Sequence, residues 1–366
     1  MVSLIQQLAS DNLIEKAYDS VCHNRRQSSC HNDIWDLRWN WTTEKNLMQQ
    51  QLLSGSYVFG TTRMRWGTAG LFEEWSARDQ IVLTGLKILL QRIYKEDISA
   101  SCYNMQGNGG MKAAVRAVAR ESKHYKYVYK SDISNYYASI NHSTLYYALR
   151  DKIHDKQILS LIHRFLVHSI EYNGTYKNIR TGISRGTPLS GLLGCIYLKS
   201  LDDVFEKKTS CCYVRYMDDF IFMTNHKYVH RRYIRKINQM LNTIQLSTAF
   251  EKTYVGTIGS SGFDFLGYHF TKATVSVANI TITRFEQKRT AKVHRWWNRF
   301  YESGLKGLTK LKGEKTLSES ISLYEHNWRK WCNAGVMELL CNIKDVESQR
   351  ITEHSMQDVG GAQTHA

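Results

Sequence analysis

The sequence predicts an α+β fold divided into two or three units. Apolar residues recur at helical spacing in residues 1–55 and 75–95, whereas short runs of β-favouring residues fill the middle of the chain. The length of 366 residues exceeds that of an ordinary domain of ~150 residues. With 42% hydrophobic residues the chain can bury a sizeable core, which excludes wholesale disorder.

The N-terminal third is predicted to be mainly helical. The amphipathic residues 1–55 include a stretch that is expected to be buried: Trp35, Leu37, Trp39 and Trp41. The helix predicted over residues 75–95 has Ser76 as a candidate N-cap. Residues 102–111 form a flexible glycine loop. This loop lacks the Lys-Ser/Thr of a phosphate-binding loop, so we do not assign it to phosphate binding.

Strands that end in carboxylates are predicted in the middle of the chain. Residues 127–133 favour a strand, and Asp132 stands near its end. Residues 213–216 and 220–223 flank Met217-Asp218-Asp219, which predicts a β-hairpin with a carboxylate pair at its tip. A further strand pair is predicted over residues 262–270.

Helices are predicted between and after these strands. The first opens at His142-Ser143-Thr144. Pro188, the single proline of the chain, follows a loop at 182–187 and begins a helix of ~18 residues, because proline suits the first helical turn. Residues 228–247 form a basic helix. Residues 284–330 contain twelve Lys/Arg and five Asp/Glu among aromatic residues, as expected of a helical bundle with a basic face.

The composition indicates a polyanionic partner. The formal net charge is +16, and 12% of the residues are aromatic, which suits stacking on bases as well as core packing. No run approaches the ~20 apolar residues of a membrane span, and the N-terminus has no secretory pattern. The eight cysteines are scattered without a CxxC, so we expect a reducing cytoplasm and no zinc at Cys22-His23 and Cys30-His31.

Three carboxylates carry the predicted chemistry: Asp132, Asp218 and Asp219. Carboxylates brought together at strand ends can hold two divalent ions ~3.5–4 Å apart, and Mg²⁺ is the natural ion for carboxylate and phosphate oxygens. The alternative for Asp218-Asp219 alone is an ordinary acidic turn. The flanking apolar strands favour the metal site, because burial of these charges without a cation is costly.

At these residues the sequence resembles reverse transcriptases. Residues 216–219 (YMDD) look like their signature tetrapeptide, and residues 131–137 (SDISNYY) resemble the first palm carboxylate motif. Residues 182–190 (GISRGTPLS) resemble the intervening loop and helix, and residues 262–268 (GFDFLGY) are similar to the primer grip of group II intron-type enzymes. Residues 76–82 resemble the fingers of that lineage. The resemblance covers roughly residues 50–345.

The resemblance implies a right-hand polymerase fold with fingers, palm and helical thumb. It divides the chain into an N-terminal helical extension (1–55), fingers (56–125) and palm (126–279, with a finger insertion at about 146–181). A basic thumb (280–345) and a disordered tail (346–366) follow. The role of residues 1–55 stays open among completing the fingers, binding RNA and packing between subunits.

The resemblance also implies roles for single residues. Asp132 and Asp218 would be the principal metal ligands, with Asp219 beside them. Tyr137 would be the steric gate against a ribose 2′-hydroxyl, or alternatively a core tyrosine. Lys252 would lie near the pyrophosphate, or alternatively be a solvated surface lysine.

Further nucleotide and nucleic-acid contacts follow from the same resemblance. Arg185 and Gly186 would lie under the incoming nucleotide, where many relatives have Gln-Gly, and Arg63 and Arg65 would hold its triphosphate. The primer grip would be formed by Phe265, Leu266 and Gly267. The thumb would track the template–primer backbone with five cations: Lys288, Arg289, Lys292, Arg295 and Arg299. The Trp296-Trp297 pair is expected in the bundle core rather than on a base-stacking surface.

The implied activity is RNA-directed DNA synthesis from dNTPs with two Mg²⁺ ions. Because the chain ends soon after the expected thumb, intron mobility is not expected. We find no retron Val-Thr-Gly, and Ser190-Gly191 replaces the Ser-Gln of diversity-generating enzymes. Compact defence-associated bacterial enzymes, which work with a structured noncoding RNA, therefore resemble the chain most.

Other functions stay open. The chain could be a retron-type or intron-derived enzyme without a defence role, a non-catalytic RNA-binding protein, or a polymerase that copies DNA or primes on protein. A homo-oligomer is compatible with all of them.

Overall fold

The computed structural model describes residues 2–67, 70–206, 208, 210–259, 261–302 and 308–335. The chain forms two compact units. Unit 1 comprises residues up to Ala114 together with His124–Thr257, and unit 2 comprises Val115–Lys123 and the residues from Ile258 onwards. The tail predicted at 346–366 lies outside the described residues, as do the side chains of residues 297, 299–302 and 308–315.

The N-terminal helices belong to the core of unit 1. They are α1 (Leu4–Leu8), α2 (Asp11–Asn24), α3 (Ile34–Trp39) and α4 (Trp41–Leu53), and they pack with α5 (Ala77–Ile93). A side chain at Gly85 of α5 would meet Leu8 Cδ1 at 2.9 Å, so the absence of a Cβ there permits the close approach of α1. Ser76 caps α5 as predicted, since its hydroxyl accepts a hydrogen bond from the Asp79 N–H.

The expected burial of the aromatic stretch is wrong at one position. Trp39 is 90% exposed, because α3 buries Ile34 and Leu37 and its last residue falls on the other face of the helix. Trp41 stacks on Tyr18 with ring centroids 3.8 Å apart, so the aromatic packing continues on α4.

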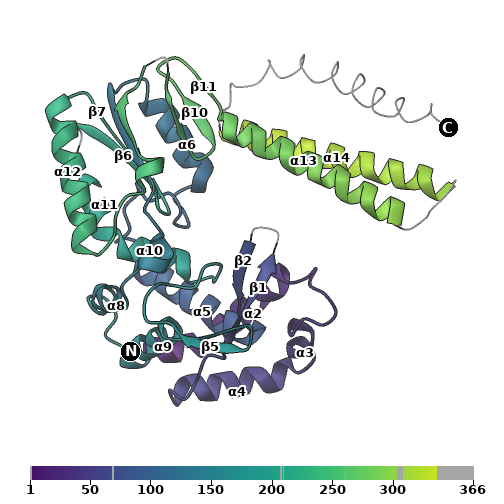
Figure 1. Cartoon of the computed structure of the whole chain (residues 1–366). Coiled ribbons are helices and arrows are strands. Elements are labelled where there is room, and N and C mark those ends of the chain that lie inside the picture. Colours follow the sequence, from purple (N-terminus) through teal and green to yellow (C-terminus); the bar gives the residue numbers. More distant parts are fainter. Residues whose placement is uncertain are drawn as a thin grey trace. The chain divides into compact units, whose positions relative to one another are not determined.

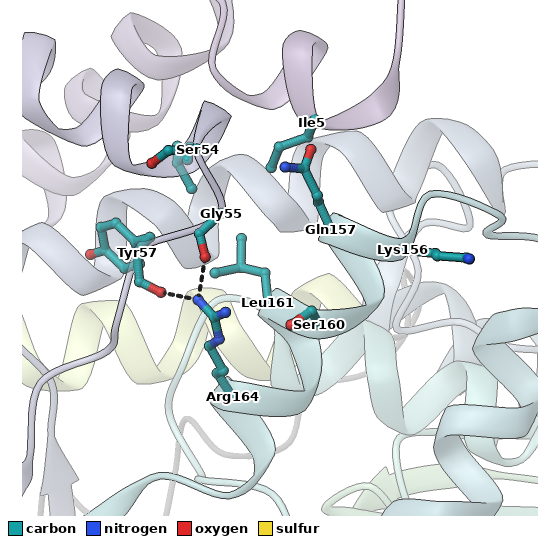
Figure 2. A pocket seen from close by; sticks show the side chains of 10 residues that line it. Ile5, Ser54, Gly55, Tyr57, Lys156, Gln157, Ser160, Leu161 and Arg164 are labelled. Carbon is teal, nitrogen blue, oxygen red and sulfur yellow. Dashed lines mark hydrogen bonds between the residues drawn. The ribbon is translucent and has the colours of Figure 1, made fainter.

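Hydrogen bonds tie the N-terminal segment to α9 (Lys156–Leu166), which follows α8 (His142–Arg150). The Ile5 N–H donates to Asp155 Oδ2 at 3.0 Å, beside a cavity of about 280 Å³. Figure 2 shows Arg164 at this cavity, where its Nη1 donates to the carbonyl oxygens of Gly55 at 2.8 Å and Tyr57 at 2.7 Å. Residues 1–55 are therefore a structural part of unit 1.

A mixed sheet of order β2-β1-β4-β5 lies beside these helices in unit 1. Its strands are β1 (Thr62–Gly67), β2 (Gly70–Glu74), β4 (Ser169–Tyr172) and β5 (Thr175–Asn178). Strands β1 and β4 pair in parallel, and the other pairs are antiparallel. Glu73 is held by the Thr62 hydroxyl at 2.6 Å and by His168, which fixes β2 against the start of β4.

The second sheet of unit 1 is antiparallel, with the order β6-β7-β3-β8 (Figure 1). Its strands are β3 (Tyr127–Ser131), β6 (Cys211–Tyr216), β7 (Asp219–Thr224) and β8 (Tyr254–Thr257). The predicted strand at 127–133 and the predicted hairpin at 213–223 are confirmed. Helix α12 (Lys227–Thr243) packs on this sheet where Tyr233 meets Phe222, with ring centroids 5.2 Å apart.

The helix predicted to begin at Pro188 begins later and is divided. Helix α10 spans Ser190–Tyr197, and α11 follows at Lys199–Glu206. The Thr187 hydroxyl accepts the Ser190 N–H at 3.3 Å, and the Ser190 hydroxyl donates to the Ser184 carbonyl at 2.5 Å. These bonds keep residues 187–189 in a turn, so the proline precedes the helix instead of opening it. Helices α7 (Tyr136–Ser139) and the short η1 (Phe250–Lys252) complete unit 1.

Unit 2 contains a small sheet and two long helices. Strands β9 (Phe263–Phe265), β10 (Tyr268–Phe270) and β11 (Val275–Val277) form the sheet, which includes the predicted strand pair. Helices α13 (Asn279–Glu302) and α14 (Leu308–Gly335) cover the region where a basic helical bundle was predicted. Phe285 stacks on Trp328 at 4.1 Å and on Tyr324 at 5.2 Å, so aromatic rings form the described core between the two helices. Helix α6 (Gly110–Glu121) contributes its residues from Val115 to this unit.

Candidate active site

The three predicted carboxylates meet at one end of the β6-β7-β3-β8 sheet. Ser131 pairs with Phe220 in the β3–β7 register, so the adjoining residues Asp132 and Asp219 lie opposite each other. Asp218 belongs to the turn between β6 and β7. Asp132 is only 7% exposed, and the other two carboxylates are half-buried. An ordinary solvated acidic turn would not bury its charges in this way.

Burial and mutual repulsion raise the pKa values of Asp218 and Asp219. The pKa of Asp219 rises from 3.8 to about 6, first because of burial and then because of the charges of Asp132 and Asp218. The pKa of Asp218 is also raised, by burial first and then by the neighbouring Asp132. A divalent cation would offset both effects, because it favours the charged forms.

Lys252 contacts the carboxylate cluster directly. Its Nζ lies 2.5 Å from Asp132 Oδ2, and this hydrogen bond raises the pKa of the lysine. The side chain is nevertheless 58% exposed, so it can leave the carboxylate without breaking a packed core. The lysine is therefore both solvated and in contact with the carboxylate cluster.

The turn that carries Asp218 is held by two residues that the sequence patterns did not single out. Met217 has a left-handed backbone, with φ 57°. Its N–H donates to Asn104 Oδ1 at 3.0 Å, and its carbonyl accepts from Arg215 Nη1 at 2.8 Å. Both backbone polar groups of the strained residue are thus satisfied by side chains.

Arg215 is fully buried and paired with a buried acid. Its Nε donates to Asp202 Oδ1 at 2.7 Å, and the Asp202 side chain also accepts from the Tyr213 hydroxyl at 3.1 Å. The sequence contains one indication of this pair. Arg215 is a charged residue within an apolar strand, and such a residue needs a buried partner. The partner could not be read from the sequence, since Asp202 belongs to α11.

The first half of the predicted glycine loop is fixed beside β6. The Tyr103 N–H donates to the Arg215 carbonyl at 2.8 Å, and the Arg215 N–H donates to the Ser101 carbonyl at 2.9 Å. Asn104 also donates to Cys195 Sγ at 2.8 Å. The expectation of a flexible loop is therefore wrong for residues 102–104, which lie along the edge of the sheet.

The adjacent residues Tyr136 and Tyr137 have different environments in the structure. Tyr136 is buried, and its hydroxyl donates to the Gly194 carbonyl at 2.5 Å, so it is the core tyrosine of this segment. Tyr137 is half-buried, and its pKa is raised to about 12 by burial first and then by nearby charges, that of Asp218 among them. The positive charge of the exposed Arg185 acts in the opposite direction and lowers the pKa of Tyr137. The positions of Tyr137 and Arg185 are therefore compatible with contacts to a nucleotide at the carboxylates.

The predicted triphosphate residues Arg63 and Arg65 lie on β1. Arg63 Nε is 3.7 Å from Glu171, and Arg65 Nε is 2.8 Å from Glu74. Both arginines are thus paired with carboxylates of their own sheet, and a triphosphate would have to compete with those pairs.

Gly186, the second predicted residue of the loop under the nucleotide, has φ +83° with open space around it, which leaves its backbone accessible.

The predicted primer grip forms the turn between β9 and β10 in unit 2. Phe265 is buried, whereas Leu266 and Gly267 have φ values of 48° and 83° and make a tight two-residue turn. A side chain at Gly267 would approach Trp331 to 3.0 Å, so the turn packs closely on α14.

The predicted thumb cations divide into two groups. Arg289 pairs with Glu325 at 2.7 Å, and Lys292 lies 5.0 Å from the ring centroid of Tyr324, so both contribute to packing against α14. Lys288 and Arg295 are exposed. The side chain of Arg299 lies outside the described residues, as does that of Trp297.

Comparison with known proteins identifies the family. The family model described as "Reverse transcriptase (RNA-dependent DNA polymerase)" matches residues 81–270, from α5 to β10. The chain belongs to the reverse transcriptase family. This match spans more than half of the chain and includes the three carboxylates and the β9–β10 turn. The predicted right-hand polymerase fold is therefore confirmed.

Its relatives include group II intron proteins. The chain is 26% identical over 145 residues to the putative COX1/OXI3 intron 2 protein of Saccharomyces cerevisiae, covering 38% of this chain and 17% of that protein. It is 27% identical over 124 residues to the group II intron-encoded protein LtrA of Lactococcus lactis, covering 34% of this chain and 21% of LtrA. The chain thus spans about a fifth of these relatives.

Two further matches cover more of the chain. Protein YkfC of Escherichia coli is 20% identical over 276 residues, covering 63% of this chain and 72% of YkfC. The solved structure described as "Partial Cas6-RT-Cas1--Cas2 complex" has a TM-score of 0.41 and 15% identity, covering 66% of this chain and 42% of that chain.

Reverse transcriptases generally use divalent metals. The all-oxygen donor set of Asp132, Asp218 and Asp219 suits Mg²⁺. Within the described ranges, however, no three His, Cys, Asp or Glu side chains are already grouped as a metal site. Lys252 is hydrogen-bonded to Asp132, so this side chain would have to move when an ion binds.

The described helices include none that is long and apolar enough to cross a bilayer.

Proposed function

We propose that this reverse transcriptase-family chain is an RNA-directed DNA polymerase that extends a primer by two-Mg²⁺ nucleotidyl transfer. The observation that carries the proposal is the cluster of Asp132, Asp218 and Asp219 at one sheet end, with the pKa values of Asp218 and Asp219 raised. Carboxylates with raised pKa values cluster at functional sites, and here the β3–β7 register brings them together.

The residues would divide the work as follows. Asp132 and Asp218 would hold the ions, with Asp219 beside them, and when bound the ions supply an acidified primer 3′-hydroxyl and a neutralised pyrophosphate. The primer 3′-hydroxyl would pass its proton to water as its oxygen bonds to the α-phosphorus, and the bond from that phosphorus to pyrophosphate would break. Lys252, freed from Asp132, would offer its ammonium group to the leaving pyrophosphate. Tyr137 would exclude a ribose 2′-hydroxyl.

A primer-extension assay tests the proposal. With poly(rA)/oligo(dT), dTTP and Mg²⁺, we expect Asp218→Asn to lower the extension rate at least about a thousandfold. The variant lacks a negative charge that would hold the ions. Asp203→Asn is the matched control, since Asp203 is an exposed carboxylate of α11 that pairs with Lys199 at the surface. Wild-type protein without Mg²⁺-dependent, Asp218-dependent product would favour a non-catalytic RNA-binding protein.

We propose further that the template is a structured noncoding RNA and that the enzyme acts in bacterial antiphage defence in the cytoplasm. The support is the resemblance of residues 182–186 (GISRG) to defence-associated enzymes, together with the net charge of +16. Deletion of the gene should reduce phage resistance, and sequencing of co-purified RNA and cDNA should identify one template and its start site. Unchanged resistance together with heterogeneous RNA would contradict the defence role.

The alternative is an intron-derived enzyme without a defence role. It is favoured by the similarity to LtrA and the COX1 intron protein. In that case the co-purified RNA would be a group II intron, and phage resistance would not depend on the chain.

A further inference from the structure

Helix α12 presents a continuous cationic face to solvent. Its sequence contains no Asp or Glu, and its five Lys/Arg residues are all exposed. At about 100° per residue they fall within one half of the helix circumference, opposite the buried His230, Tyr233, Ile237 and Leu241. The members of this face are Lys227, Arg231, Arg232, Arg235 and Lys236. We refer to them as the α12 face.

The α12 face lies away from the carboxylates in two respects. Phe222 points toward α12, where it contacts Tyr233 and His230, so by strand alternation Asp219 points to the opposite side of the sheet. In addition, α12 begins just after Thr224, the last residue of β7, whereas Asp219 is the first. A template–primer duplex placed at the carboxylates would therefore leave the α12 face unoccupied.

Helix stability does not explain this arrangement. The pairs Lys227–Arg231, Arg231–Arg235 and Arg232–Lys236 place like charges four residues apart, which destabilises a helix. Lys227 also lies in the first turn, where the helix dipole disfavours positive charge. Within the described ranges none of the five is within ion-pair distance of a carboxylate, although Arg232 lies 5.4 Å from the ring centroid of Tyr233.

The surroundings of the helix N-terminus extend the positive surface. Asn225 donates to the His124 carbonyl at 3.0 Å, which places the exposed Lys126 at the same end of the sheet. Tyr228, the second residue of α12, is 84% exposed and offers a ring for stacking. On the neighbouring α11, Asp202 is buried with Arg215, and the exposed Asp203 is paired with Lys199, whereas Glu206 is a second exposed acid of that helix.

We propose that the α12 face binds the phosphate backbone of RNA outside the copied stretch, so that a template RNA is held at a second place on unit 1. The inference rests on the proposed function only in taking RNA as the polyanion. Cations in a row with an adjacent exposed ring fit a phosphate backbone and a base, and they need no particular sequence.

A binding experiment on the full chain separates this surface from the active site. The protein is first loaded with a short oligo(rA)/oligo(dT) duplex without dNTPs, and a labelled RNA of two stem–loops is then titrated at several salt concentrations. The test variant is Lys227→Gln/Arg231→Gln/Arg235→Gln/Lys236→Gln. The matched control removes four exposed cations of other unit 1 elements: Lys16→Gln/Arg92→Gln/Lys95→Gln/Arg150→Gln.

We expect the loaded wild type to bind the stem–loop RNA, and the test variant to bind it at least about tenfold more weakly. The slope of log Kd against log salt should fall by about 3, since each lost phosphate contact contributes ~0.7–0.9. The control variant should stay within about twofold of wild type, and extension of the short duplex should be unchanged in the test variant.

Several results would overturn the inference. These are an unchanged Kd and slope in the test variant, or displacement of the RNA from wild type by the duplex. A thermal unfolding midpoint lower than that of wild type would also overturn it, because a relieved like-charge face should not destabilise the helix. An inactive wild type that still shows the RNA result would reject the polymerase proposal and leave this inference standing.

Discussion

At the scale of single residues, the candidate site depends on side chains outside the carboxylate cluster. The Met217 backbone is held by Asn104 on one side and by Arg215 on the other, and Arg215 is in turn held by Asp202. Because these bonds satisfy a strained turn, they fix where Asp218 points. We infer that Asn104, Asp202 and Arg215 are positioning residues.

Asp202→Leu should therefore leave the Arg215 charge buried without a partner. We expect a loss of about 3–5 kcal/mol in the free energy of unfolding, measured by urea denaturation, together with loss of primer extension. The double variant Asp202→Leu/Arg215→Met should recover most of the stability but not the extension, because the bond to the Met217 carbonyl is absent. Recovery of both would show that the pair serves stability alone.

Asp219 predicts a pH dependence of stability. Its pKa of about 6 exceeds the ordinary 3.8, so the folded state binds a proton more readily than the unfolded state between these values. This carboxyl therefore lowers the free energy of unfolding as the pH rises from about 4 to about 6, and the full cost is present above that range.

The measurement is the melting temperature of wild type and Asp219→Asn across this pH range, in EDTA. The variant should be more stable than wild type above pH ~6, and the difference should shrink toward pH ~4. A difference that is independent of pH would contradict the raised pKa.

At the scale of elements, the loop before α10 depends on one glycine. Gly182 has φ +88°, and a Cβ there would lie 2.8 Å from the Ala138 carbonyl oxygen. Gly182→Ala should therefore cost more than backbone strain alone, which is about 1–2 kcal/mol. Gly174→Ala is the control, because Gly174 has φ +77° and open space around it. Equal melting temperatures for the two variants would show that the loop can shift.

Local patterns predicted most of these elements. The Ser76 cap, the hairpin around Met217 and the strand pair after Gly262 were all predictable, because each depends on residues close in sequence. The start assigned to Pro188 was wrong, since hydrogen bonds among Ser184, Thr187 and Ser190 decide where α10 begins.

The candidate site was predictable in its acidic residues and, through the resemblance, in Lys252. Strand ends and the resemblance indicated Asp132, Asp218 and Asp219, because carboxylates in apolar flanks are visible in a sequence. Asn104 and Asp202 were not indicated, since each meets its partner across a long stretch of chain. Proximity of this kind is a property of the tertiary fold.

At the scale of the whole molecule, the N-terminal helices behave as part of the polymerase body. Ile5, Leu8, Leu13 and Ala17 are buried in the same core as α5. Deletion of residues 1–24 should therefore expose α5 and abolish cooperative unfolding of unit 1, measured by circular dichroism and heating. A stable, active deletion variant that lost only RNA binding would instead make the segment an accessory module. Lys16→Gln, an exposed change in α2, should unfold like wild type.

The Met217 turn also has a consequence for the order of folding. Its three supports come from the segment at Ser101–Asn104, from α11 and from β6, so no short stretch of the chain can form it alone. Contacts of such long sequence separation form late, after the surrounding structure has condensed. A ribosome-bound chain that has emerged only as far as α10 would already contain Asp132 but could not yet gather the acidic cluster. An unfinished chain would therefore have no metal-dependent activity.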